Sequence, residues 1–359
     1  MTETNDNPGL GNASERDASG LDKPALNFVS PGWPTAGGPG FLGSTEPWPV
    51  AVRALLFVVL LVGFSATLGT LAAWAGLITS SGDLTKSLLY SELTKAIGTL
   101  LAAWVMSLLE GRRLGEYGLP WGSGQGKFFL TGAVFGIVEI STIIGVLAAA
   151  GYYSFGSLEV HGAILLKWAL FWVAVFVVVG FFEEYAFRGY IQFALTKGFG
   201  FWTATIVTSL IFGLVHLANP GESWPGIAGV MAVGLFWCFT LRRTGSLWFA
   251  FGMHAAFDFG ETFLFSVPDS GVVFPGHLSS AVIHNGPSWL VGGSAGPEAS
   301  VLDFVILAVF FYVVHVMFPA KPEFPMASAT SVVGSAGEFA VSIETPAAGG
   351  ENQRTSSEA

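Results

Sequence analysis

Residues 163–197 read AILLKWALFWVAVFVVVGFFEEYAFRGYIQFALTK. The run is apolar, apart from Lys167, until it reaches Glu183, which Glu184 and Arg188 follow. About 20 apolar residues in a helix cross a hydrocarbon core of about 30 Å, so the run predicts a long membrane-spanning helix. A charged side chain inside a membrane costs several kcal/mol on insertion scales. We therefore expect the acidic pair and the arginine to have a function.

The composition of the whole chain also indicates a membrane protein. Of its 359 residues, 52% are hydrophobic and 11% are charged, and the mean hydropathy is +0.61. Soluble domains carry about 25% charged residues, so a water-soluble globular domain is excluded. Cys238 is the one cysteine in the sequence, which excludes internal disulfides and a zinc site built from thiolates.

Other apolar stretches accompany the first one along the chain. Each has roughly the length that a helix needs to span a bilayer: 51–77, 88–109, 128–151, 201–218, 224–241, 245–266 and 301–319. Barrel strands would alternate between apolar and polar residues, and these stretches do not. We therefore predict an all-α fold, a polytopic transmembrane helical bundle with about eight spans.

The positions of lysine and arginine predict the orientation of this bundle. With eight spans, the lysines and arginines outside the spans all fall on one side of the membrane, except Lys86, which falls on the other. By the positive-inside rule, both termini lie in the cytoplasm, and the membrane is the plasma membrane if the host is a bacterium. The net charge of −10 gives no support for a nucleic-acid partner. The expected partner of the protein is the lipid bilayer.

The polar segments divide the chain into three parts. Residues 1–47 and 320–359 are rich in small and polar residues, and we expect disordered cytoplasmic tails there. Residues 48–319 form the expected transmembrane domain, with a motif core at 163–266. The loop at 267–299 resembles the tails in composition, so it too is expected to be disordered.

Ionisable residues inside the predicted spans cluster in three short motifs. They are Glu183-Glu184-x-x-x-Arg188, Phe212-x-x-x-His216 and His254-x-x-x-Asp258. Residues four apart share one helix face, so Glu184 can pair with Arg188, and Phe212 can pack beneath His216. Counted from the cytoplasmic ends of their spans, the other polar groups lie at depths of about 14–22 Å. The motifs therefore predict one polar layer shared by three helices.

The chemistry of this layer leaves two mechanisms open. Two imidazoles and two carboxylates, from Glu183, His216, His254 and Asp258, suit Zn²⁺ or a similar divalent metal. The same groups also suit chemistry without a metal, in which Glu183 takes a proton from water and His254 stabilises an oxyanion.

The three motifs, in this order, resemble those of the CPBP family. That family comprises CAAX-type prenyl-protein endopeptidases and bacteriocin-processing enzymes, also called Abi proteins. The resemblance implies an intramembrane peptidase with a cavity that opens toward the cytoplasm. It implies that Glu183 and His216 activate a water, and that His254 and Asp258 bind a metal or stabilise the oxyanion. Asp258 stands where many relatives have Asn, and the added negative charge favours a metalloprotease.

The resemblance also suggests roles for other residues and a class of substrate. Glu184 and Arg188 would support the site or position substrate, together with Phe212. The substrate would be a peptide or the C-terminal region of a protein, such as a C-a-a-X tail or a leader or bacteriocin peptide. Two alternatives stay open: a non-proteolytic immunity or scaffold protein of the membrane, and a cation-coupled transporter that uses the same polar layer.

For the remaining charged residues of the spans, we predict mainly structural roles. Glu92 and Lys95 are three apart and form a neutralised pair on one helix face. Lys167 lies near a helix end and can extend its amine to the membrane surface. Glu139 and Glu261 stay open, although Glu261 lies two turns beyond the histidine of the third motif and could line the cavity.

Overall fold

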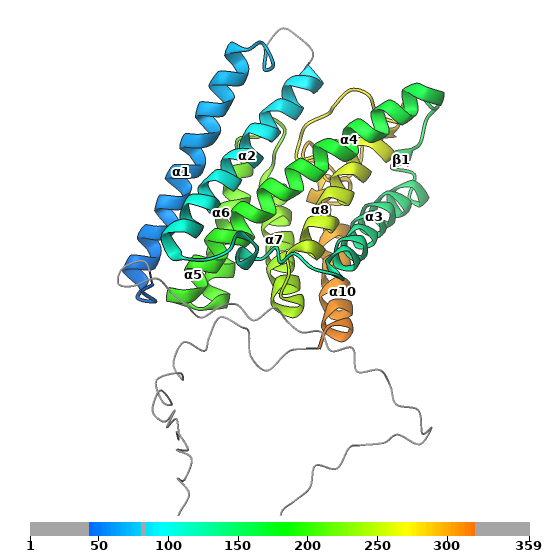
Figure 1. Cartoon of the computed structure of the whole chain (residues 1–359). Helices are drawn as coiled ribbons and strands as arrows, with labels where there is room; N and C mark the ends of the chain where they lie inside the picture. The colour runs from blue at the N-terminus through cyan, green and yellow to red at the C-terminus, as the bar shows by residue number, and fades with distance from the viewer. Residues whose placement is uncertain (1–42, 80–83, 320–359) are drawn as a thin grey trace, which may run out of the picture. The chain divides into compact units, whose positions relative to one another are not determined.

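The computed structural model describes residues 43–79 and 84–319, and this part of the chain is predominantly helical (Figure 1). The expected tails thus lie almost wholly outside the described residues. The long helices are α1 (Pro47–Trp74), α2 (Leu84–Glu110), α3 (Gln125–Ala149), α4 (Gly162–Glu183), α5 (Gln192–Phe199), α6 (Phe201–His216), α7 (Trp224–Thr244), α8 (Trp248–Phe259) and α10 (Val301–Met317). Shorter elements are η2 (Leu114–Tyr117), β1 (Tyr153–Ser154), η3 (Glu184–Ile191), η4 (Gly260–Leu264), β2 (Val282–Ile283), α9 (Ser288–Val291) and η5 (Pro297–Ala299).

Each predicted apolar stretch forms a helix, so the helical fold is confirmed. Within the described residues, five helices are long and apolar enough to cross a membrane: α1, α2, α3, α7 and the continuous helix at 162–199. Helices α6 and α10 are apolar but shorter, with 16 and 17 residues. The number of eight spans is therefore not confirmed, although the apolar helices fit an integral membrane protein.

The helices are arranged so that α4 and α8 lie between their neighbours. Helix α1 packs along α2, α2 packs on α4, α4 packs on α8, and α8 packs on α3 (Figure 1). Helices α5, α6, α7 and α10 extend from this row, with α6 against α7 and α7 against both α8 and α10. Motif residues on α4, α6 and α8 are thereby brought to neighbouring positions.

Glycines allow α3 and α8 to approach each other closely. A Cβ atom on Gly132 or Gly136 of α3 would lie 1.9 or 2.3 Å from a carbonyl oxygen of α8. A Cβ atom on Gly252 of α8 would lie 2.0 Å from a carbonyl oxygen of α3. Small residues permit such contacts between membrane helices. This packing holds α8, which carries His254 and Asp258, in a defined position.

The long helix at 162–199 is not α-helical throughout. Its central part, η3, has π-helical geometry, as does η4 at the end of α8. Wider turns of this kind occur mostly as short insertions in α-helices, frequently at functional sites. Here η3 carries Glu184 and Arg188, and η4 carries Glu261.

The loop at 267–299 is ordered, so the expectation of disorder there was wrong. Strand β2 pairs antiparallel with β1, and the amide of Leu278 donates a hydrogen bond of 2.9 Å to the carbonyl of Phe263. The hydroxyl of Tyr153 donates to the carbonyl of Phe265 at 2.7 Å. The Gly, Pro and Ser residues form tight turns that fold this loop back over the end of α8, which composition alone does not reveal.

Candidate active site

The acidic pair lies where α4 becomes η3, and its two members have different surroundings. Glu184 and Arg188 are each 1% exposed, and Arg188 Nη1 lies 3.0 Å from Glu184 Oε1, so the predicted pair is confirmed. Glu183 precedes them and is half-buried, with its carboxylate on the wall of a cavity. Pairing offsets the cost of burying the glutamate and the arginine. It leaves Glu183 available for a partner in the cavity.

Aromatic rings surround the guanidinium of Arg188. Its central carbon lies 3.8 Å from the centroid of the Phe212 ring and 5.1 Å from a ring centroid of Trp237. Cations are attracted to the faces of aromatic rings, and more strongly where water is excluded. Gly234 makes room for this side chain, because a Cβ atom there would lie 2.6 Å from Arg188 Nη2. The arginine is therefore held in place from α6 and α7 as well as from its own helix.

His254 is held on one side by Glu184 and faces the cavity on the other. Its Nδ1 atom lies 3.0 Å from Glu184 Oε1. An ionised carboxylate accepts and cannot donate, so Nδ1 carries a proton. Its Nε2 atom lies 3.3 Å from Asp258 Oδ2 and 3.7 Å from Glu183 Oε2. The ring of Trp237 stacks on the imidazole, with centroids 4.5 Å apart and planes 20° apart.

His216 has a similar arrangement at the end of α6. Its Nδ1 atom donates to the carbonyl oxygen of Phe212 at 2.8 Å, because that oxygen can only accept. The ring of Phe212 contacts the imidazole edge to face at 4.7 Å, which confirms the predicted packing. The Nε2 atom of His216 is therefore free to face the cavity as a base or a ligand.

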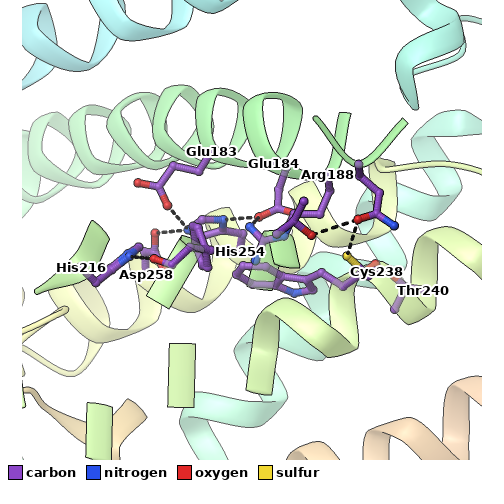
Figure 2. Close-up of polar contacts among 12 residues, drawn as sticks. Glu183, Glu184, Arg188, His216, Cys238, Thr240, His254 and Asp258 are labelled. Carbon is purple, nitrogen blue, oxygen red and sulfur yellow. Dashed lines mark hydrogen bonds and ion pairs between the residues drawn. The ribbon is translucent and has the colours of Figure 1, made fainter. Parts of the chain in front are cut away.

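These groups converge on one cavity of about 440 Å³. Figure 2 shows Glu183, His216, His254 and Asp258 around a common space, from α4, α6 and α8. Glu92 and Lys95 also line this cavity and form the predicted pair, with Nζ 2.6 Å from Oε1. The structure thus brings the four predicted residues together, while their roles in catalysis stay predictions.

Several residues of the cavity were not identified from the sequence. The ring of Trp237 packs against both His254 and Arg188. In the sequence, nothing distinguishes this tryptophan from the others of the apolar stretches. Asp269 and Glu298 line the cavity from the loop after α8. Burial, and secondarily the neighbouring Asp258 carboxyl, raise the pKa of Asp269 well above its ordinary value. The Gly- and Pro-rich composition of this loop gave no signal that these acids are partly buried against the cavity.

The comparison with protein families agrees with this geometry. The family described as "Rce1-like: Type II CAAX prenyl endopeptidase Rce1-like" matches residues 165–260. That segment contains all three motifs, so the predicted resemblance is confirmed. Searches of curated proteins and of solved structures found no match to the chain. The matched segment is therefore similar to a CAAX-type prenyl endopeptidase, and the apolar helices indicate an integral membrane protein.

Proposed function

We propose that this protein is an intramembrane endopeptidase that hydrolyses a peptide bond in the cavity between α4, α6 and α8. The observation that carries the proposal is the arrangement of Glu183, His216 and His254, whose reactive atoms face one cavity while Glu184 and Phe212 hold the opposite ring nitrogens. A carboxylate and an imidazole that face one cavity can together activate a nucleophilic water for hydrolysis. The family match to residues 165–260 supports the same activity.

The residues imply an order of proton transfers. Glu183 accepts a proton from the attacking water, and His216 orients that water through its free Nε2 atom. When His254 is protonated on both nitrogens, it donates from Nδ1 to Glu184 and from Nε2 toward the developing oxyanion. Asp258, 3.3 Å from that Nε2 atom, stabilises the imidazolium between turnovers. Glu183 then returns its proton to the leaving amine.

The types of side chain present also suit a divalent metal, although in the described residues the acidic or imidazole atoms that gather within 4.8 Å of one another belong to Asp258, Glu261 and Asp269. Both histidines have Nδ1 engaged as a donor, which leaves an Nε2 lone pair as a ligand, the arrangement that metal-binding histidines usually have. Two imidazoles and two carboxylates form a donor set that Zn²⁺ accepts. A Zn²⁺ ion held by Glu183, His216, His254 and Asp258 would polarise the scissile carbonyl and acidify a bound water. With such an ion the metal would acidify the water, whereas without one Glu183 takes the proton.

We further propose that the apolar helices form eight spans with both termini in the cytoplasm. In the eight-span arrangement, the three shorter crossings are formed by α6, by α8 together with η4, and by α10. The substrate would be the C-terminal region of a protein, a C-a-a-X tail if the host prenylates proteins, or otherwise a leader or bacteriocin peptide. The apolar cavity wall formed by Val175, Phe176 and Val179 of α4 suits an apolar or lipidated segment.

The test is cleavage of defined peptides by the full-length protein in detergent. Wild type, Glu183→Gln and His216→Asn would be assayed on a farnesylated C-a-a-X peptide and on an unprenylated peptide of the same sequence. We expect each variant to lose about 10²–10⁴-fold in kcat, the usual contribution of general acid–base catalysis. Glu159→Gln is the matched control, because Glu159 lies in a loop with its side chain 48% exposed.

Elemental analysis of the purified protein addresses the metal, and the variants address the alternatives. Stoichiometric zinc in wild type that is lost in His216→Asn would support the metalloprotease. Peptidase activity unchanged in both variants would refute the assignment. A phenotype that survives Glu183→Gln would favour a non-proteolytic immunity or scaffold role. Cation flux in reconstituted vesicles would favour a transporter.

A further inference from the structure

A second acidic group lies beside the candidate active site. It consists of Asp258 on α8, Glu261 on η4 and Asp269 in the following loop. One carboxylate oxygen from each residue lies within 4.8 Å of one from each of the others. Asp258 is 9% exposed, Glu261 is 0% exposed and Asp269 is half-buried. Three carboxyl groups are thus crowded together, and that of Glu261 is shut off from solvent.

Glu261 indicates that a ligand belongs in this space. Both of its carboxylate oxygens are buried, and neither has a hydrogen-bond partner among the described residues. Burying a carboxylate without a partner is strongly unfavourable. Protonation does not remove the problem, because a carboxylic acid still needs an acceptor for its O–H group. A cation between Glu261 and its two acidic neighbours would satisfy these oxygens.

The donor atoms indicate the class of cation. All three ligands are carboxylates, and hard cations such as Ca²⁺ prefer oxygen ligands of this kind. Calcium–oxygen bonds of about 2.3–2.6 Å place ligand oxygens up to about 5 Å apart across the ion. The spacing within 4.8 Å fits that geometry. Zn²⁺ usually takes nitrogen or sulfur ligands as well, which this group does not offer.

Two neighbouring residues complete the surroundings. The hydroxyl of Thr262 donates to Asp269 Oδ2 at 3.0 Å, which orients that carboxylate. Glu298 lines the same cavity as Asp258 and Asp269, and its Oε1 atom is also buried without a hydrogen-bond partner in the described structure. Glu298 can therefore supply a further oxygen, directly or through a bound water.

We propose that Asp258, Glu261 and Asp269 bind a hard divalent cation of the Ca²⁺ class, at a site separate from Glu183 and His216. Asp258 connects the two sites, because its Oδ2 atom lies 3.3 Å from His254 Nε2. The cation holds Asp258 in place and thereby positions His254. Glu261 and Asp269 are positioning residues, since neither is among the groups that face the reacting atoms.

Cation binding can be measured without substrate, on the full-length protein in detergent after treatment with EDTA. Adding Ca²⁺ to wild type should raise Tm, and isothermal titration calorimetry should give one site. Glu261→Gln should bind Ca²⁺ at least about tenfold more weakly, since affinity follows the number of charged ligands. In EDTA its Tm should equal or exceed that of wild type, because an unpaired buried charge has been removed. Glu159→Gln should retain the wild-type response.

The outcomes separate this site from the candidate active site. Glu183→Gln and His216→Asn should keep the Ca²⁺-induced rise in Tm even if both abolish peptidase activity. Loss of the rise in these two variants, with retention in Glu261→Gln, would overturn the proposal. So would a wild-type Tm that responds to none of Ca²⁺, Mn²⁺ and Mg²⁺. If Glu261→Gln does not fold, Asp269→Asn is expected to show the same loss of binding and decides the question.

Discussion

The Nδ1 atom of His254 lies 3.0 Å from the Oε1 atom of Glu184, and the same oxygen lies 3.0 Å from Arg188 Nη1. The second glutamate of the motif therefore links the arginine of its own helix to a histidine of α8. This contact places the proton of His254 on Nδ1 and directs Nε2 toward Glu183 and Asp258. The first glutamate, on the wall of the cavity, is left for chemistry.

Glu184→Gln should impair catalysis although residue 184 does not line the cavity. A neutral amide oxygen still accepts from both His254 and Arg188, but it lacks the negative charge that offsets the guanidinium and stabilises a protonated His254. Removing a carboxylate behind a functional histidine typically costs about 10–100-fold in activity. Steady-state kinetics on the cleavable peptide should show this loss in kcat with KM little changed. An effect confined to KM would assign Glu184 to substrate binding instead.

Arg188→Met should affect stability more than chemistry. The arginine is 1% exposed, and its removal leaves the Glu184 carboxylate buried without its ion partner. Breaking a buried pair in this way costs about 3–5 kcal/mol. Thermal unfolding in detergent should show a markedly lower Tm. Lys127→Met is the control, because Lys127 is exposed in the first turn of α3 and its loss should shift Tm far less.

Trp237→Leu tests the ring that stacks on His254. The centroids are 4.5 Å apart and the planes nearly parallel, so leucine removes the stacking but keeps an apolar contact. Aromatic pairs contribute about 0.5–1.5 kcal/mol beyond burial, which corresponds to a kcat reduced by about 2–10-fold. Trp237→Phe should retain most of the activity. Equal losses in the two variants would mean that the indole acts by its size and not by stacking.

The helices and the three motifs could be predicted because both follow local rules. Apolar length predicts a membrane helix, and spacing by four residues predicts that Glu184 reaches Arg188 and that Phe212 reaches His216. The contact between Glu184 and His254 could not be predicted, because it joins residues 70 positions apart. It depends on how α4 packs against α8, and the motifs contain no information about that packing.

The acids of the loop after α8 could not be predicted for a different reason. Asp269 and Glu298 stand among Gly, Pro and Ser residues, a composition typical of exposed or disordered loops. Their burial follows from the pairing of β1 with β2 and from the contacts of the loop with η4, which are long-range. Glu261 could be placed near the cavity from its position two turns after His254. That its carboxylate has no hydrogen-bond partner among the described residues is visible only in three dimensions.

Gly252→Ala should reduce activity through the packing of α8 on α3. A methyl group at this position would lie 2.0 Å from a backbone carbonyl oxygen of α3, so the two helices must separate. The movement displaces α8 and with it His254 and Asp258, and a shift of about 1 Å in a catalytic group can cost about 100-fold in rate. Gly145→Ala in α3 is the matched control, because a Cβ atom there meets nothing within 4 Å.

The two glycine variants should also differ in stability. Gly252→Ala should lower both kcat and Tm, whereas Gly145→Ala should leave kcat unchanged and slightly raise Tm, since alanine favours a helix more than glycine does. Peptide cleavage and thermal unfolding in the same detergent would measure both quantities. Full activity in Gly252→Ala would show that the position of α8 tolerates movement, and that the close contact between α3 and α8 is not what holds His254 and Asp258 at the cavity.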